Sequence, residues 1–123
     1  MASTVLIAED SSVIRNITKR VLSFQNYTLI SAKNGSDVLQ KLESEPVDLI
    51  LMDINMPVMD GLECTKKIRT HAKEAIRSIP IIAVTGNAKN YTKEEYQALG
   101  INEFLQKPLN FDVLVHHVRK ILG

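Results

Sequence analysis

The stretch LILMDINMPVMDGLE, Leu49 to Glu63, sets an unbroken apolar run directly against an acid, Asp53, at the point where the run stops. An apolar run of this length is typical of a strand buried on both faces, as in a parallel sheet. Pro57 and Gly61 then predict that the chain turns away from the end of the strand. The strand therefore carries a carboxylate to the edge of the sheet and leaves it accessible.

Similar short runs alternate with longer segments of helical periodicity along the whole chain. Strands are expected at 4–8, 28–32, 48–52, 80–85 and 103–106, and helices at 11–24, 36–44, 61–75, 92–99 and 111–122. Buried strands joined by helices predict a parallel sheet covered on both faces, because right-handed crossovers place the helices there. We expect a three-layer, doubly wound α/β fold with five strands and five helices.

Capping residues support these boundaries. Asp10, Ser11 and Ser12 are all candidates to cap the first helix, Asp60 with Gly61 stands where the third should begin and Asn110 where the last should begin, and Gly100 stands where the fourth should end.

The first expected helix carries an apolar stripe. Val13, Ile17, Val21 and Phe24 recur at helical spacing and predict packing against the core, whereas Ile14 lies off that stripe.

Length and composition indicate one ordinary domain, residues 1–123. Hydrophobic residues make up 45% and charged residues 24% of the chain, as in globular proteins. The net charge of +1 gives no support for direct binding to nucleic acid or to anionic membranes. We expect a cytoplasmic location, because the sequence has neither a signal peptide nor an apolar run long enough to span a bilayer. Cys64, the single cysteine, is expected to fill space on a helix.

Polar residues follow four of the expected strands. Glu9 and Asp10 come after the first strand, Asp53 ends the third, Thr85 ends the fourth, and Lys107 follows the fifth. Taken singly, each is explained by a helix cap, a turn or a solvated charge. Ligands of parallel sheets bind at the carboxyl ends of the strands, so these side chains should share one edge. Three carboxylates at one edge require a cation.

Oxygen ligands without His or Cys favour Mg²⁺, usually completed by a phosphate. With Lys107 pairing the same phosphate, charge on a transferring phosphoryl group would be neutralised from two sides, and a carboxylate could act as the nucleophile. His71, His116 and His117 are expected at surface positions on helices, away from the carboxylates.

Over its whole length the chain resembles the response-regulator receiver domains of two-component signalling. The resemblance rests on IAEDS, LILMDINMPVMDG, AVTGN and FLQKP, in this order and spacing. It implies a flavodoxin-like sheet of strand order 2-1-3-4-5, the order known for a chemotaxis protein of this family. The implied activity is Mg²⁺-dependent transfer of a phosphoryl group from a partner phosphohistidine to the domain itself, without turnover of a separate substrate.

The resemblance also implies roles for residues of the acidic edge. Asp53 is similar to the phosphorylated aspartate, and Lys107 to the lysine that pairs with the phosphoryl group. Asp10 and the main-chain carbonyl of Asn55 resemble Mg²⁺ ligands beside Asp53, with Glu9 acting through a water. Glu9 departs mildly from the family pattern, since many relatives have Asp there.

Further roles follow from the same resemblance. Thr85 and Phe104 are similar to the hydroxyl and aromatic residues that switch on phosphorylation and shift the fourth helix, fifth strand and fifth helix. Asn87, with Asn55, is expected to flank the route of hydrolytic water. The Lys107-Pro108 bond resembles a cis peptide of the family, and Ile14 is a candidate for docking the phosphodonor.

The expected partners are a sensor histidine kinase or a histidine-phosphotransfer protein, and an unidentified downstream target. The protein would act as a monomer or as a phosphorylation-dependent dimer. The start of the chain at Met1 and its end after the last helix favour a free-standing regulator, but a receiver segment of a hybrid histidine kinase would have the same sequence features.

Two other classes are less consistent with the residues. Haloacid-dehalogenase-like phosphotransferases need a second carboxylate two residues after the nucleophile, where this chain has Asn55. A non-phosphorylated, flavodoxin-like or dinucleotide-binding module would be expected to have a glycine-rich phosphate loop after the first strand, and none is present.

Overall fold

The structure is a computed structural model and describes residues 2–86 and 91–123. Five parallel strands form one sheet in the order β2-β1-β3-β4-β5. The strands are β1 (Thr4–Ala8), β2 (Thr28–Ala32), β3 (Leu49–Asp53), β4 (Ile81–Thr85) and β5 (Glu103–Gln106). The predicted strand order 2-1-3-4-5 and the flavodoxin-like α/β class are confirmed.

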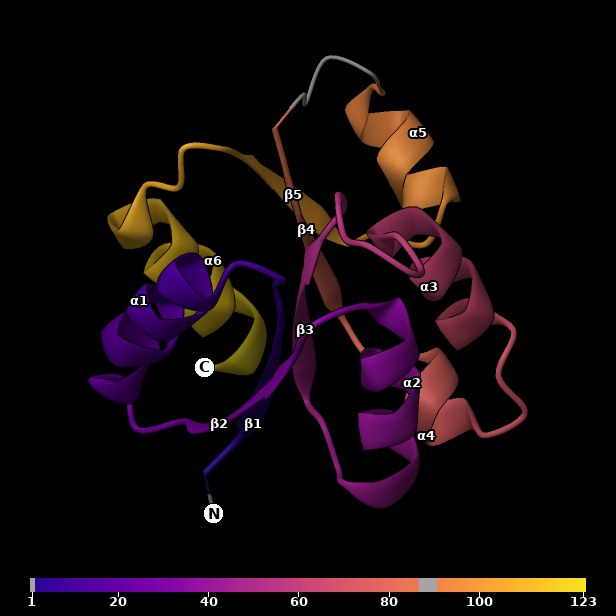
Figure 1. The fold of residues 1–123 in the computed structure, drawn as a ribbon, viewed down its shortest axis with the longest axis horizontal. Coiled ribbons are helices and arrows are strands. Elements are labelled where there is room, and N and C mark those ends of the chain that lie inside the picture. Colours follow the sequence, from indigo (N-terminus) through magenta and orange to yellow (C-terminus); the bar gives the residue numbers. More distant parts are fainter. Residues whose placement is uncertain (1, 87–90) are drawn as a thin grey trace.

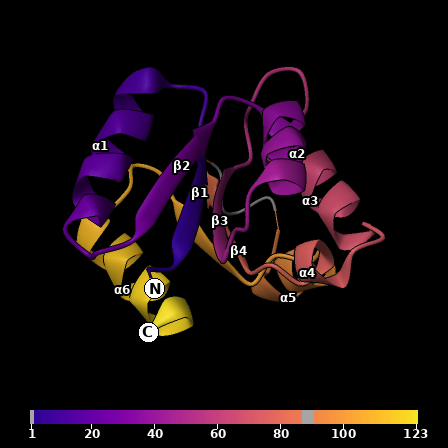
Figure 2. The same cartoon turned by 90° about the horizontal axis from the view of Figure 1, so that it is seen from below.

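Helices cover both faces of the sheet (Figures 1 and 2). The helices are α1 (Ser12–Ser23), α2 (Gly35–Ser44), α3 (Gly61–Arg69), α4 (Glu74–Arg77), α5 (Lys93–Ala98) and α6 (Phe111–Leu122). One apolar core lies between the sheet and α1 with α6, and the other lies between the sheet and the remaining helices. In the described part of the chain, no helix is both long enough and apolar enough to cross a membrane.

The helix expected over 61–75 is divided into α3 and α4, so the described residues form six helices. The hydroxyl of Thr70, the C-cap residue of α3, donates to the carbonyl of Lys66 at 3.0 Å. The backbone N–H of Lys73 then donates to Nδ1 of His71 at 2.9 Å, which holds the chain in a turn before α4 begins. Side-chain competition for backbone hydrogen bonds thus interrupts a segment with good helical periodicity.

The predicted caps are confirmed. The side chains of Ser11, Asp60 and Asn110 accept hydrogen bonds from backbone N–H groups in the first turns of α1, α3 and α6. Gly100 follows α5 with a φ of 94°, a conformation that favours glycine.

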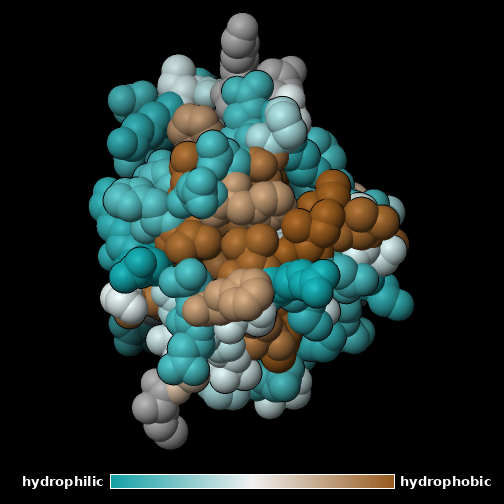
Figure 3. All heavy atoms as spheres, turned by 90° about the vertical axis from the view of Figure 1, so that its left-hand side faces the viewer, coloured by the Kyte–Doolittle hydropathy of each residue, from teal (hydrophilic) through white to brown (hydrophobic). Residues whose placement is uncertain are grey.

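The predicted orientation of α1 is wrong. Val13, Ile17 and Phe24 are 66%, 44% and 80% exposed, and the fourth residue of that stripe is half-buried. Thr18 and Leu22 face the sheet instead, at 3% and 0% exposure. Thr18 is accommodated in the core because its hydroxyl donates to the carbonyl one turn earlier. The outward residues contribute to an apolar band on the α1 and α6 face (Figure 3).

Candidate functional site

The carboxyl edge of the sheet brings the acidic residues together. Asp53 is the last residue of β3, the central strand, and it is 2% exposed. β1 pairs alongside β3 as far as Ala8, so Glu9 and Asp10 leave β1 beside Asp53. One carboxylate oxygen from each of the three residues lies within 4.8 Å of the other two. The parallel pairing of β1 with β3 therefore brings together acids that are far apart in the sequence.

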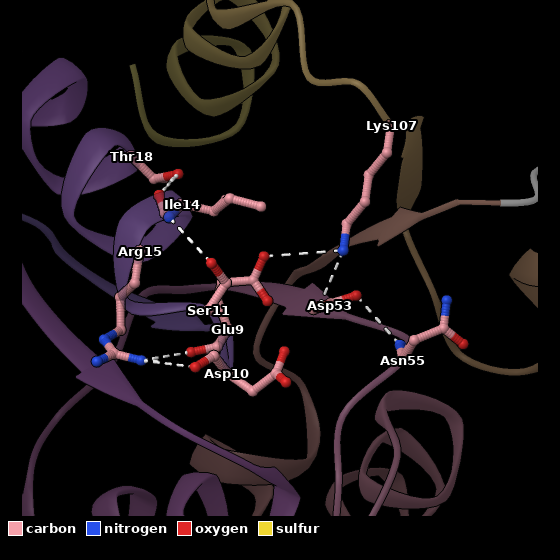
Figure 4. Close-up of polar contacts among 9 residues, drawn as sticks. All are labelled: Glu9, Asp10, Ser11, Ile14, Arg15, Thr18, Asp53, Asn55 and Lys107. Carbon is pink, nitrogen blue, oxygen red and sulfur yellow. Dashed lines mark hydrogen bonds and ion pairs between the residues drawn. The ribbon is translucent and has the colours of Figure 1, made fainter.

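Lys107 reaches this cluster from the far side of the sheet. Its backbone N–H donates to the carbonyl of Thr85 at 2.8 Å, and its peptide bond to Pro108 is cis. Its Nζ donates to Oδ2 of Asp53 at 3.1 Å and lies 3.7 Å from Oε1 of Glu9 (Figure 4). One ammonium group therefore neutralises part of the charge of two carboxylates.

Backbone groups and one arginine fix the acids in place. The N–H of Asn55 donates to Oδ1 of Asp53 at 3.1 Å, while the Asn55 amide points away from the cluster (Figure 4). Nη1 of Arg15 donates to the carbonyl of Glu9 at 2.8 Å and to that of Asp10 at 3.4 Å. Sequence reasoning misses Arg15, because no local pattern distinguishes it from other helix-surface arginines.

Glu9 is strained electrostatically. The residue is 5% exposed, and its Oε2 is buried without a hydrogen-bond partner among the described residues. Burial raises the pKa of Glu9 from 4.5 to about 8; the neighbouring Asp53 adds to the rise, and Lys107 opposes it. The buried carboxylate is thus poorly compensated by protein groups alone.

These residues fit a divalent cation. They offer three carboxyl groups, and one buried oxygen of Glu9 has no hydrogen-bond partner among the described residues. Within the described chain a single ammonium group, that of Lys107, lies nearby. Asp10 is exposed to solvent. Hard oxygen donors without His or Cys select Mg²⁺, which keeps several waters and tolerates an open site. The three acids are therefore chemically suited to hold a Mg²⁺ ion.

The other candidate residues lie around the cluster at differing depths. Thr85 is 4% exposed at the end of β4. Phe104 is half-buried in β5, where it stacks on Tyr96 with ring centroids 4.6 Å apart. Ile14 lines a groove of about 260 Å³ that borders Lys107. Asn87 lies outside the residues that the structure describes.

The histidines are not part of this site. His71 bonds Oε1 of Glu43 through Nε2 at 2.5 Å, just beyond the end of α3. His116 is exposed on α6, and Nδ1 of His117 lies 3.7 Å from Oε2 of Glu103. The expectation that no histidine joins the acids is met within the described chain, but the expected helical position of His71 is wrong, because this residue lies in the turn between α3 and α4.

Comparison with known proteins agrees with this architecture. Residues 5–119 match the response regulator receiver domain family. The chain is 41% identical over 114 residues to the CAI-1 autoinducer sensor kinase/phosphatase CqsS of Vibrio cholerae, covering 93% of this chain and 16% of that protein. It is 37% identical over 118 residues to the sensor protein EvgS of Escherichia coli, covering 96% and 10% respectively. The chain thus spans only a small part of these relatives.

Solved structures are similar over nearly the whole chain. The chemotaxis response regulator CheY4 of Vibrio cholerae has a TM-score of 0.88 at 30% identity, with 98% of this chain and 99% of that chain covered. The receiver domain of the sensor histidine kinase PA1611 from Pseudomonas aeruginosa, solved with magnesium in its active site cleft, has a TM-score of 0.87 at 31% identity, with 100% and 99% covered. With this fold, this acidic triad and a family match over residues 5–119, the chain belongs to the response regulator receiver domain family.

Proposed function

We propose that Asp53 is the phosphoacceptor and that Lys107 and the neighbouring acids are the machinery that serves it. The observation that carries this assignment is the contact of 3.1 Å between Nζ of Lys107 and Oδ2 of Asp53, in the middle of the acidic triad. A receiver domain is not a conventional enzyme, because it accepts the phosphoryl group on its own side chain and later releases it as phosphate.

In the proposed reaction, a carboxylate oxygen of Asp53 attacks the phosphorus of a phosphohistidine. A P–O bond forms, the P–N bond to the donor histidine breaks, and the imidazole nitrogen keeps the electron pair and takes up a proton. Lys107 stays within reach of the transferred group, because its backbone is held by Thr85. The hydrogen bond from the N–H of Asn55 fixes the other carboxylate oxygen of Asp53.

Asp10, Asp53 and the main-chain carbonyl of Asn55 are the proposed Mg²⁺ ligands, with Glu9 acting through a water. The buried orphan oxygen of Glu9 supports this placement. When bound, Mg²⁺ supplies positive charge that offsets the charge of the transferring phosphoryl group. The protein's part is to hold the acidic side chains close together: Lys107 pairs with Asp53, and Arg15 holds the main chain that carries Glu9 and Asp10.

We further propose that Thr85 and Phe104 convert phosphorylation into a change of surface at α5, β5 and α6, the last three elements of the chain. Both residues lie in neighbouring paired strands, β4 and β5, that lead to the acidic edge. Phosphorylation adds charge and acceptor oxygens that a hydroxyl can bond. Asn55 and Asn87 are the proposed modulators of hydrolysis.

The proposed phosphodonor is a sensor histidine kinase or a histidine-phosphotransfer protein that docks over Ile14. Ile14 and Ile17 line the apolar groove beside Lys107, together with residues 108, 109 and 111. Because Lys107 contacts Asp53, a protein seated in this groove would lie next to the acceptor. The exposed apolar residues of α1 extend the same surface.

The wider setting is proposed on the same basis. Residues 1–123 are taken as a single receiver domain acting in the cytoplasm, either free-standing or as a segment of a hybrid histidine kinase. The sensor kinase relatives, of which the chain matches a small part, support the second setting. Output then comes from a monomer or from a dimer formed on phosphorylation, toward a target yet to be identified.

Intact mass after incubation with acetyl phosphate tests the acceptor. The wild type should gain one phosphoryl group in the presence of Mg²⁺ and none in EDTA, and Asp53→Asn should gain none. Asp112→Asn, which changes an exposed acid at the start of α6, is the matched control and should label like the wild type. Labelling of Asp53→Asn at the wild-type level would refute the assignment. If nothing labels, mass and stability measurements with beryllofluoride would separate a short-lived phosphoaspartate from an inactive receiver.

Transfer from a phosphorylated sensor kinase, such as CqsS, tests the docking surface. Ile14→Asp should slow this transfer at least about tenfold, because a charge in an apolar contact is costly to desolvate, and it should leave labelling by acetyl phosphate unchanged. Val113→Asp on α6, where the native valine is 41% exposed, is the control. Equal slowing by both variants would contradict docking over Ile14.

A further inference from the structure

α5 is held to the rest of the domain by very little buried surface. Across residues 91–99, all of which the structure describes, every residue is exposed except Tyr96. Tyr96 is 2% exposed and belongs to the core on the α2, α3 and α5 side of the sheet. Figure 1 shows α5 at the outer edge of this layer, beside β5.

The longer helices are each anchored by at least two buried side chains. α1 and α6 bury two residues each, α2 buries three and α3 buries four, whereas α5 has six residues and buries one. The N-terminal end of α5 is closed by a capping box between Thr92 and Glu95, which is internal to the segment and adds no contact to the sheet. A helix with one buried side chain is expected to open locally at low cost.

The ring of Tyr96 touches the strand that leads to Lys107. Tyr96 stacks on Phe104 with centroids 4.6 Å apart and an interplanar angle of 28°. Tyr91 also meets the ring of Tyr96 edge-on, with centroids 5.4 Å apart and an interplanar angle of 65°. Phe104 lies three residues before Lys107, whose Nζ contacts Asp53. The three rings therefore form a continuous path from exposed residues before α5 to the strand that carries the site lysine.

The C-terminal end of α5 is fixed independently of these rings. The N–H of Ile101 donates to the carbonyl of Tyr96 at 3.0 Å, and Nε of Arg69 donates to the carbonyl of Gly100 at 2.9 Å. We therefore expect α5 to move by pivoting about its C-terminal end. Whether the helix stays packed against β5 then depends on the ring of Tyr96.

We infer that Tyr96 is a positioning residue that seats α5 on Phe104, so that α5 follows any displacement of Phe104. The inference rests on the proposed function, because the displacement is driven by phosphorylation of Asp53. It adds to that function an aromatic contact, between Tyr96 and Phe104, through which the signal reaches α5. The chemistry at Asp53 does not require Tyr96.

Hydrogen exchange of the whole chain, measured by mass spectrometry, tests whether Tyr96 holds α5 against Phe104. Without ligand, amides of α5 should exchange about tenfold faster in Tyr96→Leu than in the wild type, because one aromatic pair is worth about that factor in an opening equilibrium. Tyr96→Phe keeps both ring contacts and should match the wild type. Leu99→Ala, which truncates a residue that is 41% exposed, is a second control and should also match.

Beryllofluoride with Mg²⁺, used as the phosphoryl mimic, tests the coupling. It should alter exchange at residues 53–61 in all variants, but at α5 only in the wild type, Tyr96→Phe and Leu99→Ala. Labelling of Asp53 by acetyl phosphate should be unchanged in Tyr96→Leu, which shows that the variant is folded.

Unchanged exchange of α5 in unliganded Tyr96→Leu, or a normal response of its α5 to beryllofluoride, would overturn the inference while leaving the acceptor assignment intact. No response at residues 53–61 in any variant, together with no phosphoryl adduct, would overturn the proposed function and the coupling with it.

Discussion

Nζ of Lys107 lies 3.1 Å from Oδ2 of Asp53, a side chain that is almost completely buried, and within the described chain it is also the ammonium group nearest to Glu9. Removing it would leave the buried carboxylate of Asp53 without a protein cation, and the buried Glu9 side chain beside it without an opposing positive charge. Lys107→Ala should therefore lower the free energy of unfolding in EDTA at pH 7 by about 1–3 kcal/mol, less than for a fully buried pair because Lys107 is partly exposed.

Urea denaturation measures this loss, and excess Mg²⁺ should restore part of it because the ion replaces the missing charge. Lys93→Ala, an exposed lysine on α5, is the control and should change stability very little. Equal losses in the two variants would show that Lys107 does not stabilise the acidic cluster.

Glu9 predicts an unusual pH dependence for the metal-free protein. Its pKa is raised from 4.5 to about 8 in the fold, so between these values the folded state holds a proton that the unfolded state has released. Stability contributed by this group is then full below about pH 4.5 and falls as the pH rises toward 8, by an amount on the order of a few kcal/mol. Most acids that are paired in a fold show the opposite slope.

Urea denaturation in EDTA across this pH range, compared between the wild type and Glu9→Gln, isolates the contribution. The difference in unfolding free energy between the two proteins should grow steadily from about pH 5 to about pH 8, with the variant the more stable at the higher pH. A difference that does not vary with pH would mean that Glu9 is ionised throughout.

The sheet and the acidic edge were predictable from sequence because both depend on simple periodic patterns. Buried parallel strands are apolar throughout, and the residues that end them share one edge whatever the details of packing. Glu9, Asp53 and Lys107 can therefore be found by their positions after strands. Arg15 is missed because its role depends on a backbone contact that only the folded turn creates.

The orientation of α1 could not be derived in the same way. Its sequence contains one apolar stripe through Val13, Ile17 and Phe24, and a second through Thr18 and Leu22 that is interrupted by a hydroxyl. Periodicity favours the first, but the backbone hydrogen bond of Thr18 removes the penalty for burying the second. The division of α3 from α4 has a similar origin in local side-chain bonding to the backbone.

Val58 adopts a backbone conformation that β-branched residues rarely tolerate. Its φ is 69°, its side chain is 83% exposed, and the N–H of Met59 donates to the carbonyl of Pro57 across it at 2.7 Å. Relief of strain worth about 1–3 kcal/mol should outweigh the entropy cost of glycine, about 0.5–1 kcal/mol. Val58→Gly should therefore raise stability by about 1 kcal/mol.

Thermal unfolding compares Val58→Gly with Val58→Ala. The alanine variant also removes the exposed apolar side chain but keeps a Cβ, so it should gain less than the glycine variant. If the alanine variant gained as much, exposure of the valine rather than backbone strain would be the cause.

Gly61 fixes how closely α3 approaches the strand that carries Asp53. A Cβ at this position would lie 2.4 Å from the carbonyl oxygen of Asp53 and 2.9 Å from Cα of Ile54, and both are backbone atoms that cannot move aside independently. Gly61→Ala must therefore push α3 away from β3 or displace Asp53, at a cost of about 2–4 kcal/mol.

Gly86→Ala is the matched control, because a Cβ there meets nothing within 4 Å. Urea denaturation should show the loss only for Gly61→Ala, and acetyl phosphate labelling should slow only in that variant, since the acceptor carboxylate is carried by the displaced backbone. Normal labelling in a destabilised Gly61→Ala protein would mean that α3 yields while Asp53 stays in place, and that the close approach serves the packing of α3 rather than the position of the acceptor.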